Sequence, residues 1–560
     1  MQHQRYRPQT SVKPCALMLA ILSCLAIQAR AHAAERGRDT AVSNDATPAP
    51  AAGKTAAPAS DDAADPQAQA SGQAVPEKKA RAGAAGKAEA DKVVQLGAVT
   101  VTAQKREERP QDVPIALSVF DAQSLDDHKI EGGAELLRAT PNVTFSKSNF
   151  ASYNFSIRGV GTKALSVTTD PGVAVSFNST PLIRNRLFEQ EYFDVNRIEV
   201  LRGPQGTLYG RNATGGVVNM LPNLPSLDGF DSWFKAETGN FDSRRFSGMV
   251  NVPIGSTLAY RLAGAWTKRS GYDNNTVTNK DVNGRDLWGG RMGLLWKPSD
   301  KFSANLIWEH FNENDDRSRT GKQLCHNDPG PTEIGDTAVP EFNQPQFSQG
   351  CQPGSLYGKG AFGVPNGASL SQLLFARTSL PLGITPDFLE MPSLVKPGDP
   401  FAGVQQSTNL RTIATTYDPR FKAKNDVVQI NLEFKPSEDL KLVSQTAYSR
   451  DFYYSTQDYG RFQSNPIFND SNGLINPFPD PVTGAFGLPA YPITPGGVYT
   501  DPQLGPSTGY LAVDLVRSHS KQWSQEFRLQ SAFEGRFNFS VGANYLDYKI
   551  NEDYFVFNNV

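Results

Sequence analysis

The run LRGPQGTLYGRNATGGVVNM, residues 201–220, is the segment from which we predict the fold of the first part of this chain. Its glycines are too closely spaced for a helix or a regular strand ladder, and they permit positive φ and close backbone packing. The segment 197–201 before the run and the segment 217–220 at its end are predicted strands. No Lys-Ser/Thr pair follows the last glycine into a helix, so the run is not a nucleotide-binding phosphate loop.

Residues 111–225 around this run are predicted to form one compact α/β domain. Apolar residues cluster or alternate over short stretches, as they do in strands. One short helix is predicted after Asp121, and a second is predicted to end before Pro141. The other predicted strands are 113–120, 154–158 and 173–177.

After Pro225, apolar and polar side chains alternate with a period of two residues. In the stretch 258–267 one face carries Leu258, Tyr260, Leu262, Gly264 and Trp266. About nine such stretches occur, with a further strand predicted from Asp553. Strands of about 10–13 residues whose apolar faces end in aromatic residues are typical of membrane β-barrels. A soluble β-sandwich is the alternative, although its strands are usually shorter.

The connections between these strands alternate between short and long. Short turns on one side and long loops on the other are typical of an outer-membrane barrel, with the long loops outside the cell. The predicted turns are 253–256, 297–300, 435–439 and 534–535, the long connections are 268–286, 313–424 and 453–518, and the one short outer join is 239–242.

The first 33 residues read as a secretory signal peptide, with a basic start, a short apolar stretch and small-residue cleavage sites. A retained anchor and a lipidated Cys24 are the alternatives. Residues 34–92 are rich in Ala and Pro, and they carry too few apolar groups to form a core. We therefore expect a disordered leader there, which cannot supply a folded signalling domain.

Two cysteines remain after removal of the signal, Cys325 and Cys351, in a loop rich in Gly and Pro. In an exported chain they are expected to form a disulfide, with two free thiols as the alternative.

The charges of the chain nearly balance. Lys and Arg number 55 and Asp and Glu 57, which gives no support for a nucleic-acid partner. No catalytic spacing or metal-ligand cluster stands out, so neither an enzyme nor a cofactor is predicted.

Residues 93–110 connect the leader to the α/β domain. The β-prone segment 93–101 is followed by the charged stretch QKREERP at 104–110. The β-prone part is either the first strand of the next domain or a strand that docks on the sheet edge of a partner, which would bind mainly through backbone hydrogen bonds.

Four motifs taken together resemble the family of TonB-dependent outer-membrane receptors, over about residues 93–560. The resemblance implies a mainly β chain in which a small α/β plug domain (111–225) precedes long antiparallel strands of an outer-membrane β-barrel (226–560). The motifs are VTVTAQKREERPQDVPIALSV (99–119), SIRGVGT (156–162), FDVNRIEVLRGPQGTLYGRNATGGVVNM (193–220) and SQEFRLQS (524–531).

The resemblance also implies roles for single residues. The TonB box, which a TonB-type energy transducer of the periplasm pulls on, corresponds to Val99, Thr100, Val101 and Thr102 within the segment 93–110. Plug arginines of the family face glutamates of the barrel wall. Arg158, Arg202 and Glu526 match such a latch, with ordinary structural pairing as the alternative.

Two features depart from the family pattern. In the segment matching 175–182, where plugs often carry Asp-Gly, this chain has SFNST at 176–180, which puts the usual turn in question. A plug of this size needs the lumen of a barrel of twenty-two strands, and nine or ten strands are too few. The chain is therefore expected to be a C-terminally truncated or partial product, with an incomplete barrel that forms an open, curved sheet with an unpaired edge.

The function implied by the resemblance is energy-coupled import across the bacterial outer membrane, in contact with outer-membrane lipid. The cargo expected by default is a ferric siderophore complex. Signalling without import, a passive porin-like barrel and a non-functional fragment are the alternatives. Candidate ligand contacts are Thr162, Thr169, Tyr453, Tyr454 and Tyr459.

Overall fold

The chain divides into two units, Met1–Gly97 and Ala98–Val560, and the residues described in this computed structural model all belong to the second. The predicted signal peptide, the leader and Val99 lie outside the described residues. The described residues are 100–147, 153–162, 169–184, 190–369, 395–396, 398–459, 463–472, 483 and 493–559.

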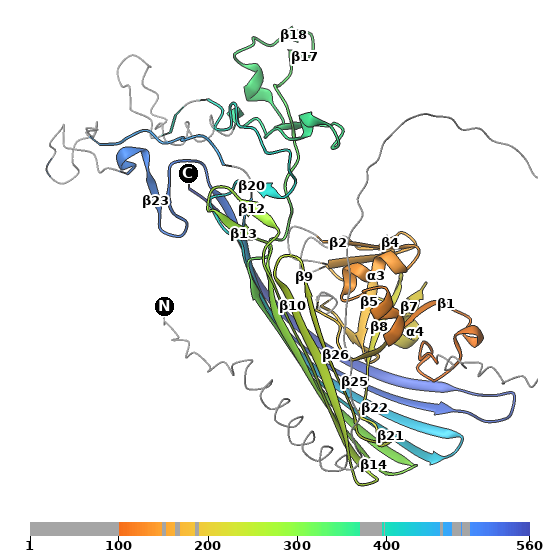
Figure 1. Ribbon diagram of the computed structural model, residues 1–560. Helices are drawn as coiled ribbons and strands as arrows, with labels where there is room; N and C mark the ends of the chain where they lie inside the picture. The colour runs from red at the N-terminus through yellow and green to blue at the C-terminus, as the bar shows by residue number, and fades with distance from the viewer. Residues whose placement is uncertain are drawn as a thin grey trace, which may run out of the picture. The chain divides into compact units, whose positions relative to one another are not determined.

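Nine long strands form one antiparallel sheet, which we call the wall (Figure 1). This is the number of long strands expected, but the tenth strand predicted from Asp553 is wrong. Asp553 continues the ninth strand, where it pairs with Arg517. The strands are β9 (Asp231–Gly239), β10 (Ser243–Ile254), β11 (Leu258–Arg269), β14 (Arg285–Ser299), β15 (Phe302–Asp315), β21 (Arg420–Ser437), β22 (Leu440–Asp458), β25 (Ala512–Ser531) and β26 (Ser540–Asn558).

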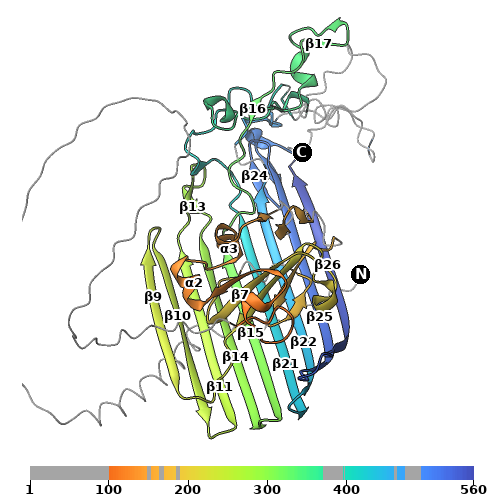
Figure 2. The same ribbon diagram turned by 90° about the vertical axis from the view of Figure 1, so that its right-hand side faces the viewer.

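The wall is an open sheet within the described residues, with β9 and β26 at its two edges. Figure 2 shows the strands side by side in chain order between these edges. The expected open sheet with unpaired edges is thus present.

The two faces of the wall differ in chemistry, because successive side chains of a strand point to opposite faces. On one face large apolar side chains are exposed, among them Trp296, Trp308 and Phe434. On the other face polar and charged side chains are buried, such as Arg291 and Gln429. The apolar face continues across strand pairs at matched positions, as the register of Trp308 with Met292 and Val428 shows. The described helices are all short, and none has the length and apolar character of a membrane-crossing helix.

Short turns join the strands at one end of the wall, and longer connections join most of them at the other. At the loop end the strands run further than predicted, because polar pairs such as Lys422 with Tyr454 continue the hydrogen-bonded ladder. The prediction that residues 453–454 belong to a loop is therefore wrong. The loop segments contain β12 (Asp273–Asn275), β13 (Lys280–Val282), β17 (Glu333–Ile334), β18 (Thr337–Ala338), β20 (Thr412–Ile413), β23 (Tyr499–Asp501), β24 (Gly505–Ser507), η3 (Gln344–Phe347), η4 (Lys359–Ala361) and η5 (Pro495–Gly497).

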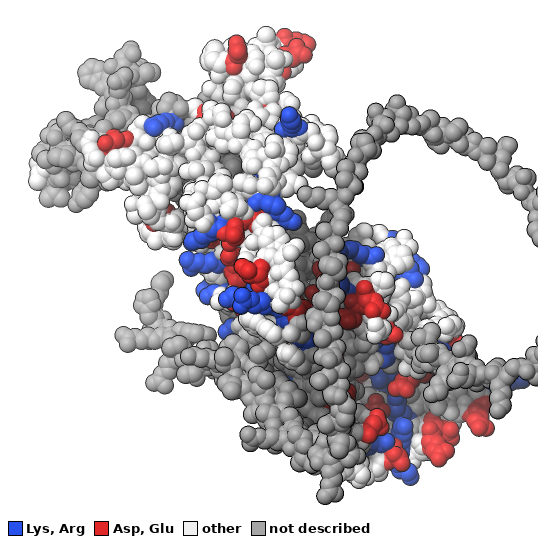
Figure 3. All heavy atoms as spheres, in the orientation of Figure 1, with Lys and Arg blue, Asp and Glu red and all other residues white. Residues whose placement is uncertain are grey.

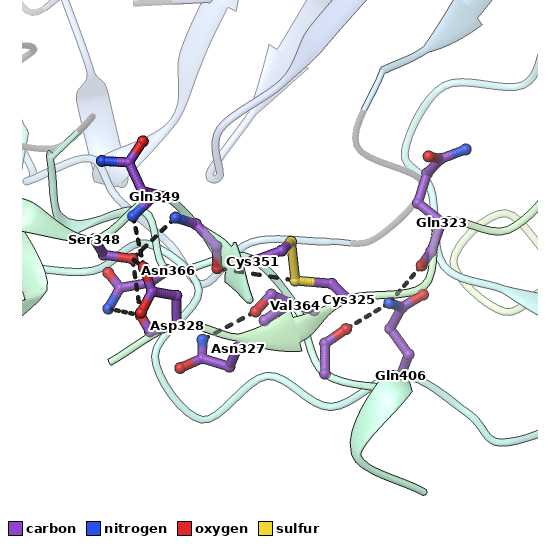
Figure 4. Close-up of a disulfide and its surroundings, with 12 residues drawn as sticks. Gln323, Cys325, Asn327, Asp328, Ser348, Gln349, Cys351, Val364, Asn366 and Gln406 are labelled. Carbon is purple, nitrogen blue, oxygen red and sulfur yellow. Dashed lines mark hydrogen bonds between the residues drawn. A yellow bond between two sulfur atoms is a disulfide. The ribbon is translucent and has the colours of Figure 1, made fainter. Parts of the chain in front are cut away.

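The long connection between β15 and β21 is braced by a disulfide between Cys325 and Cys351, whose Cα atoms are 5.4 Å apart (Figure 4). The short strands β16 (His326–Asn327) and β19 (Cys351–Gln352) pair beside it. The Asp328 carboxylate accepts the backbone N–H of Gln349 at 2.7 Å, and this bond is the main cause that lowers the pKa of Asp328. The disulfide and the carboxylate thus both tie residues 325–328 to residues 349–351.

Residues 100–225 form the second part of this unit, which we call the small domain. Its main sheet has the order β1-β7-β8-β5-β6. The buried strand β5 is parallel to β8, and the other pairs are antiparallel. The elements are η1 (Pro110–Asp112), β1 (Ala116–Asp121), α2 (Ala122–Asp127), α3 (Gly133–Ala139), β2 (Val143–Lys147), β3 (Tyr153–Ile157), β4 (Val160–Gly161), β5 (Val173–Phe177), β6 (Thr180–Leu182), β7 (Val195–Arg202), α4 (Gly206–Tyr209) and β8 (Gly216–Pro222).

The glycine-rich run links β7 to β8 through the single helical turn α4. The prediction that the run contains no helix is therefore wrong at Gly206–Tyr209. Gly216 starts β8 with φ of +151°, and a Cβ there would lie 2.2 Å from the carbonyl oxygen of Leu201. Only glycine allows the two strands to approach this closely.

Replacing Gly216 with Ala should therefore lower the free energy of unfolding of the small domain by about 2 kcal/mol or more. Hydrogen exchange of the β7 and β8 amides in the full chain measures this loss. Gly206→Ala, in the same run, is the control, because a Cβ at Gly206 meets nothing within 4 Å. Equal exchange in the two variants would contradict the prediction.

Candidate functional site

Residues 100–108, which we call the coupling segment, lie against the small domain. The backbones of Val101 and Glu108 bond to each other at 2.8 and 3.0 Å and fold the segment back on itself. Val101 and Ala103 are fully buried, and they pack in a cluster that includes Leu201 and Tyr209. Three of the four predicted TonB-box residues are described. Of these Val101 is buried, Thr102 is half-buried and Thr100 is exposed.

A buried carboxylate of β7 holds this segment in place. Glu199 is fully buried, and it accepts the backbone N–H of Thr102 at 2.7 Å and the Thr102 hydroxyl at 3.1 Å. Arg197 donates to the same carboxylate at 2.8 Å and to the Thr102 hydroxyl at 3.2 Å. A buried charge is tolerated only when it is paired and hydrogen-bonded. Thr102 therefore supplies part of the environment that Glu199 needs.

Lys105 ties the coupling segment to the wall. Its backbone has φ of +61°, and its side chain is 1% exposed. The Nζ atom donates to the carbonyl oxygen of Ser179 and to Oε2 of Glu526, each at 3.0 Å. It also lies 5.1 Å from the centre of the Tyr209 ring. Burial lowers the pKa of Lys105, and the Glu526 carboxylate opposes this shift.

The predicted latch between plug arginines and Glu526 is not the contact that the structure forms. Glu526 pairs with Lys105 and with Arg528 of its own strand. Arg158 is exposed in the turn between β3 and β4. Arg202 ends β7, and its buried Nε has no hydrogen-bond partner. No sequence pattern pointed to Lys105, because a lysine in the charged stretch 104–110 reads as part of a solvated linker.

Arginines of β10, β11 and β14 anchor the segment 191–194 of the small domain by charge. Arg261 binds both carboxylate oxygens of Asp194, at 2.6 and 2.7 Å. Arg291 donates to the carbonyl oxygens of Phe193 and Asp194 at 3.2 and 2.9 Å. Arg245 donates to the carbonyl oxygen of Tyr192 at 3.1 Å and forms an ion pair with Glu191 at 3.4 Å. Charge-assisted bonds of this kind are stronger than neutral ones.

Side-chain amides of β21, β22 and β25 hold the β5–β6 hairpin on the opposite side. Gln429 donates to the Thr180 hydroxyl at 2.6 Å, Gln445 to the Asn178 carbonyl at 2.9 Å and Gln522 to the Pro181 carbonyl at 2.7 Å. The turn here forms with Asn178 and Ser179 at φ of 46° and 66°, so the departure from Asp-Gly does not prevent it. Among the described residues, the charged contacts on this side are Lys105 with Glu526 and Arg184 with Glu552.

The predicted ligand contacts fall in different environments. Tyr453 is fully buried in the wall beside Phe421, so it is not the exposed contact expected. Tyr454 points to the opposite face of β22, where it pairs in register with Lys422. Thr169 and Tyr459 are exposed, and Thr162 is half-buried. No group of three or more His, Cys, Asp or Glu among the described residues is placed to hold a metal ion.

Comparison with known proteins gives one family. The model of the TonB-dependent receptor plug domain matches residues 109–217. The pesticin receptor of Yersinia pestis is 28% identical over 198 residues, which are 35% of this chain and 28% of that protein. The ferric-pyoverdine 358 receptor of Pseudomonas putida is 29% identical over 190 residues, 34% of this chain and 22% of that protein. The matches thus span less than a third of the length of these relatives.

Among solved structures, the siderophore receptor PiuA from Acinetobacter baumannii aligns with a TM-score of 0.47 at 14% sequence identity. The alignment covers 80% of this chain and 47% of that one.

Replacing Lys105 with Met keeps a similar side-chain length but removes the donor to Ser179 and Glu526. We expect the coupling segment to detach more often, because a charge-assisted bond contributes about 1.5–3 kcal/mol. A cysteine placed at the buried Ala103 should then react with a maleimide roughly tenfold faster or more. Arg106→Met is the control, since the Arg106 side chain is 55% exposed. Equal rates in both variants would show that Lys105 does not hold the segment.

Replacing Thr102 with Val removes the hydroxyl bonds to Glu199 and Arg197 but keeps the backbone bond. This change should weaken docking by about 1 kcal/mol, which corresponds to roughly fivefold faster labelling of a cysteine at Ala103. Thr100→Val is the matched control, because Thr100 is exposed. If the control accelerated labelling as much as Thr102→Val, the hydroxyl bonds would not account for the effect.

Proposed function

We infer that this chain, which belongs to the TonB-dependent receptors of the outer membrane, imports a scarce solute by energy-coupled movement of its plug. The small domain is the plug, and the wall is the part of the barrel against which it packs. The observation that carries the proposal is the docked coupling segment, which is held by the buried carboxylate of Glu199 on the plug and by the contact of its own buried Lys105 with Glu526 on the wall.

The cargo that we propose is a ferric siderophore complex. The support is the name of one relative, the ferric-pyoverdine 358 receptor. The solute would bind from outside, where the long loops and the disulfide-braced segment lie. Thr162, Thr169 and Tyr459 remain candidate contacts in this proposal.

The partner that we propose is a TonB-type energy transducer of the periplasm. A strand of the transducer would pair with the backbone of Val99–Thr102, which requires this segment to leave the plug. In the docked state Thr102 gives its N–H to Glu199 and Val101 is buried, so partner and plug compete for the same residues. Import would then depend on release of the coupling segment.

The asymmetric attachment of the plug supports a directed movement. Arginines hold the 191–194 side, and mostly neutral amides hold the β5–β6 side. Once Thr102 has left Glu199, a pull on the coupling segment acts on Lys105, whose Nζ holds Ser179 on the amide side. We therefore propose that this side of the plug yields while the arginine side stays attached.

Deleting Val99–Thr102 should abolish uptake of radioiron supplied as ferric pyoverdine, while binding of the same complex at the cell surface persists. The proposed reason is that the deletion removes the docking strand and leaves the loops intact. The control is deletion of Asp61–Ala64, a stretch of equal length in the expected leader. Unchanged energy-dependent uptake without Val99–Thr102 would refute coupled import through this segment.

A further inference from the structure

Charged groups of both signs lie close together where the small domain meets the long strands (Figure 3). On the plug-side face of β25, the alternate residues Glu526, Arg528 and Gln530 follow one another. Oε2 of Glu526 accepts a hydrogen bond from Nζ of Lys105 at 3.0 Å, and Gln530 donates to the Lys105 carbonyl oxygen at 3.3 Å. An arginine therefore lies between the two residues of β25 that contact Lys105.

Arg528 differs from the arginines that anchor the plug. Arg261 and Arg291 donate to the segment 191–194, whereas Arg528 donates to Oε1 of Glu526 on its own strand. The Nε atom of Arg528 is buried, and within the described residues it has no hydrogen-bond partner. Among the hydrogen bonds of the described residues, none joins Arg528 to the plug, so holding the plug does not explain its position.

The carboxylate of Glu526 is shared between two cations. Lys105 binds one oxygen and Arg528 the other, and the exposed fractions of these two basic side chains are 1% and 13%. Water therefore screens the repulsion between the two cations only weakly. Burial is the main cause that lowers the pKa of Lys105, and the positive charge of Arg528 lowers this pKa further. Docking of the coupling segment thus brings a second cation close to Arg528.

Glu526 keeps a partner when Lys105 leaves. Arg528 belongs to the same strand, so its ion pair with Glu526 does not require the coupling segment. Without this arginine, release would leave a largely buried carboxylate unpaired, which is strongly unfavourable. Arg528 therefore opposes docking in two ways, because it repels Lys105 in the docked state and pairs with Glu526 in the released state.

We propose that Arg528 is a positioning residue of the wall that sets how readily the coupling segment is released. This inference rests on the proposed function, in which import requires that release. Docking should become tighter, rather than looser, when Arg528 loses its charge. An arginine that merely stabilised the interface would have the opposite effect, since its removal would loosen the contact.

A second arginine beside the coupling segment provides a matched contrast. Arg197 donates to the buried carboxylate of Glu199 at 2.8 Å and also to the Thr102 hydroxyl at 3.2 Å, so it bonds to the segment itself. Each of the two arginines pairs with a glutamate two positions away on its own strand. Because Arg197 also holds the segment, its loss should loosen docking.

The test measures maleimide labelling of a cysteine placed at Ala103, in the full chain purified without ligand or transducer. The parent protein carries Ala103→Cys alone. Arg528→Gln, which keeps a hydrogen-bond donor but removes the charge, should slow labelling roughly fivefold or more. Arg197→Gln should accelerate labelling. Arg528→Lys, which keeps the charge, should label within about twofold of the parent, as should Arg536→Gln in the exposed turn after β25.

A double-mutant cycle shows whether the effect depends on Lys105. In a protein that already carries Lys105→Met, Arg528→Gln should change the labelling rate by less than about twofold, because the coupling segment then places no charge beside Glu526. Equal slowing with and without Lys105 would overturn the proposal. Labelling of Arg528→Gln that is as fast as that of the parent, or faster, would overturn it as well.

The labelling assay separates this inference from the proposed function. The assay contains neither transducer nor solute, so its result does not depend on whether the chain imports anything. Slower labelling of Arg528→Gln supports the role of Arg528, whatever the uptake of radioiron shows. A circular dichroism spectrum of β type in each variant verifies that the wall is folded. Arg528→Met, a second neutral variant, should also slow labelling, and it keeps the test open should Arg528→Gln fail to fold.

Discussion

The alternation of side chains along the nine long strands gives the wall two chemically different faces. One face must be apolar where it meets lipid tails, and the other is free to carry the polar groups that hold the plug. Arg261, Arg291 and Gln429 all belong to this second set.

Against this wall the plug is held unevenly. Asp194 binds Arg261 through two short bonds, whereas the β5–β6 hairpin is held mainly by the amides of three glutamines. The coupling segment depends on two buried groups, the carboxylate of Glu199 and the ammonium of Lys105. Because Lys105 also reaches Ser179, a pull on the segment is transmitted to the weakly held side of the plug.

Local patterns were enough to predict much of the fold. The two-residue rhythm predicted the long strands, and the glycines of 201–220 predicted a tight link between β7 and β8. The strand ends were missed where polar ladder pairs such as Lys422 with Tyr454 replace apolar ones. The contact of Lys105 with Glu526 joins residues 421 apart in the sequence, so no local pattern could have predicted it. Arg158 and Arg202 were chosen by analogy, and the fold places them elsewhere.

Hydrogen exchange of the backbone amides of Val101 and Thr102, in the full chain without ligand, tests most directly whether the coupling segment is held on the plug. Both amides are hydrogen-bonded, to Glu108 and to Glu199. We predict exchange at least about a hundredfold slower than in an unstructured peptide of the same sequence. Exchange at the rate of the free peptide would contradict the account, because the segment would then be undocked before any ligand or partner binds.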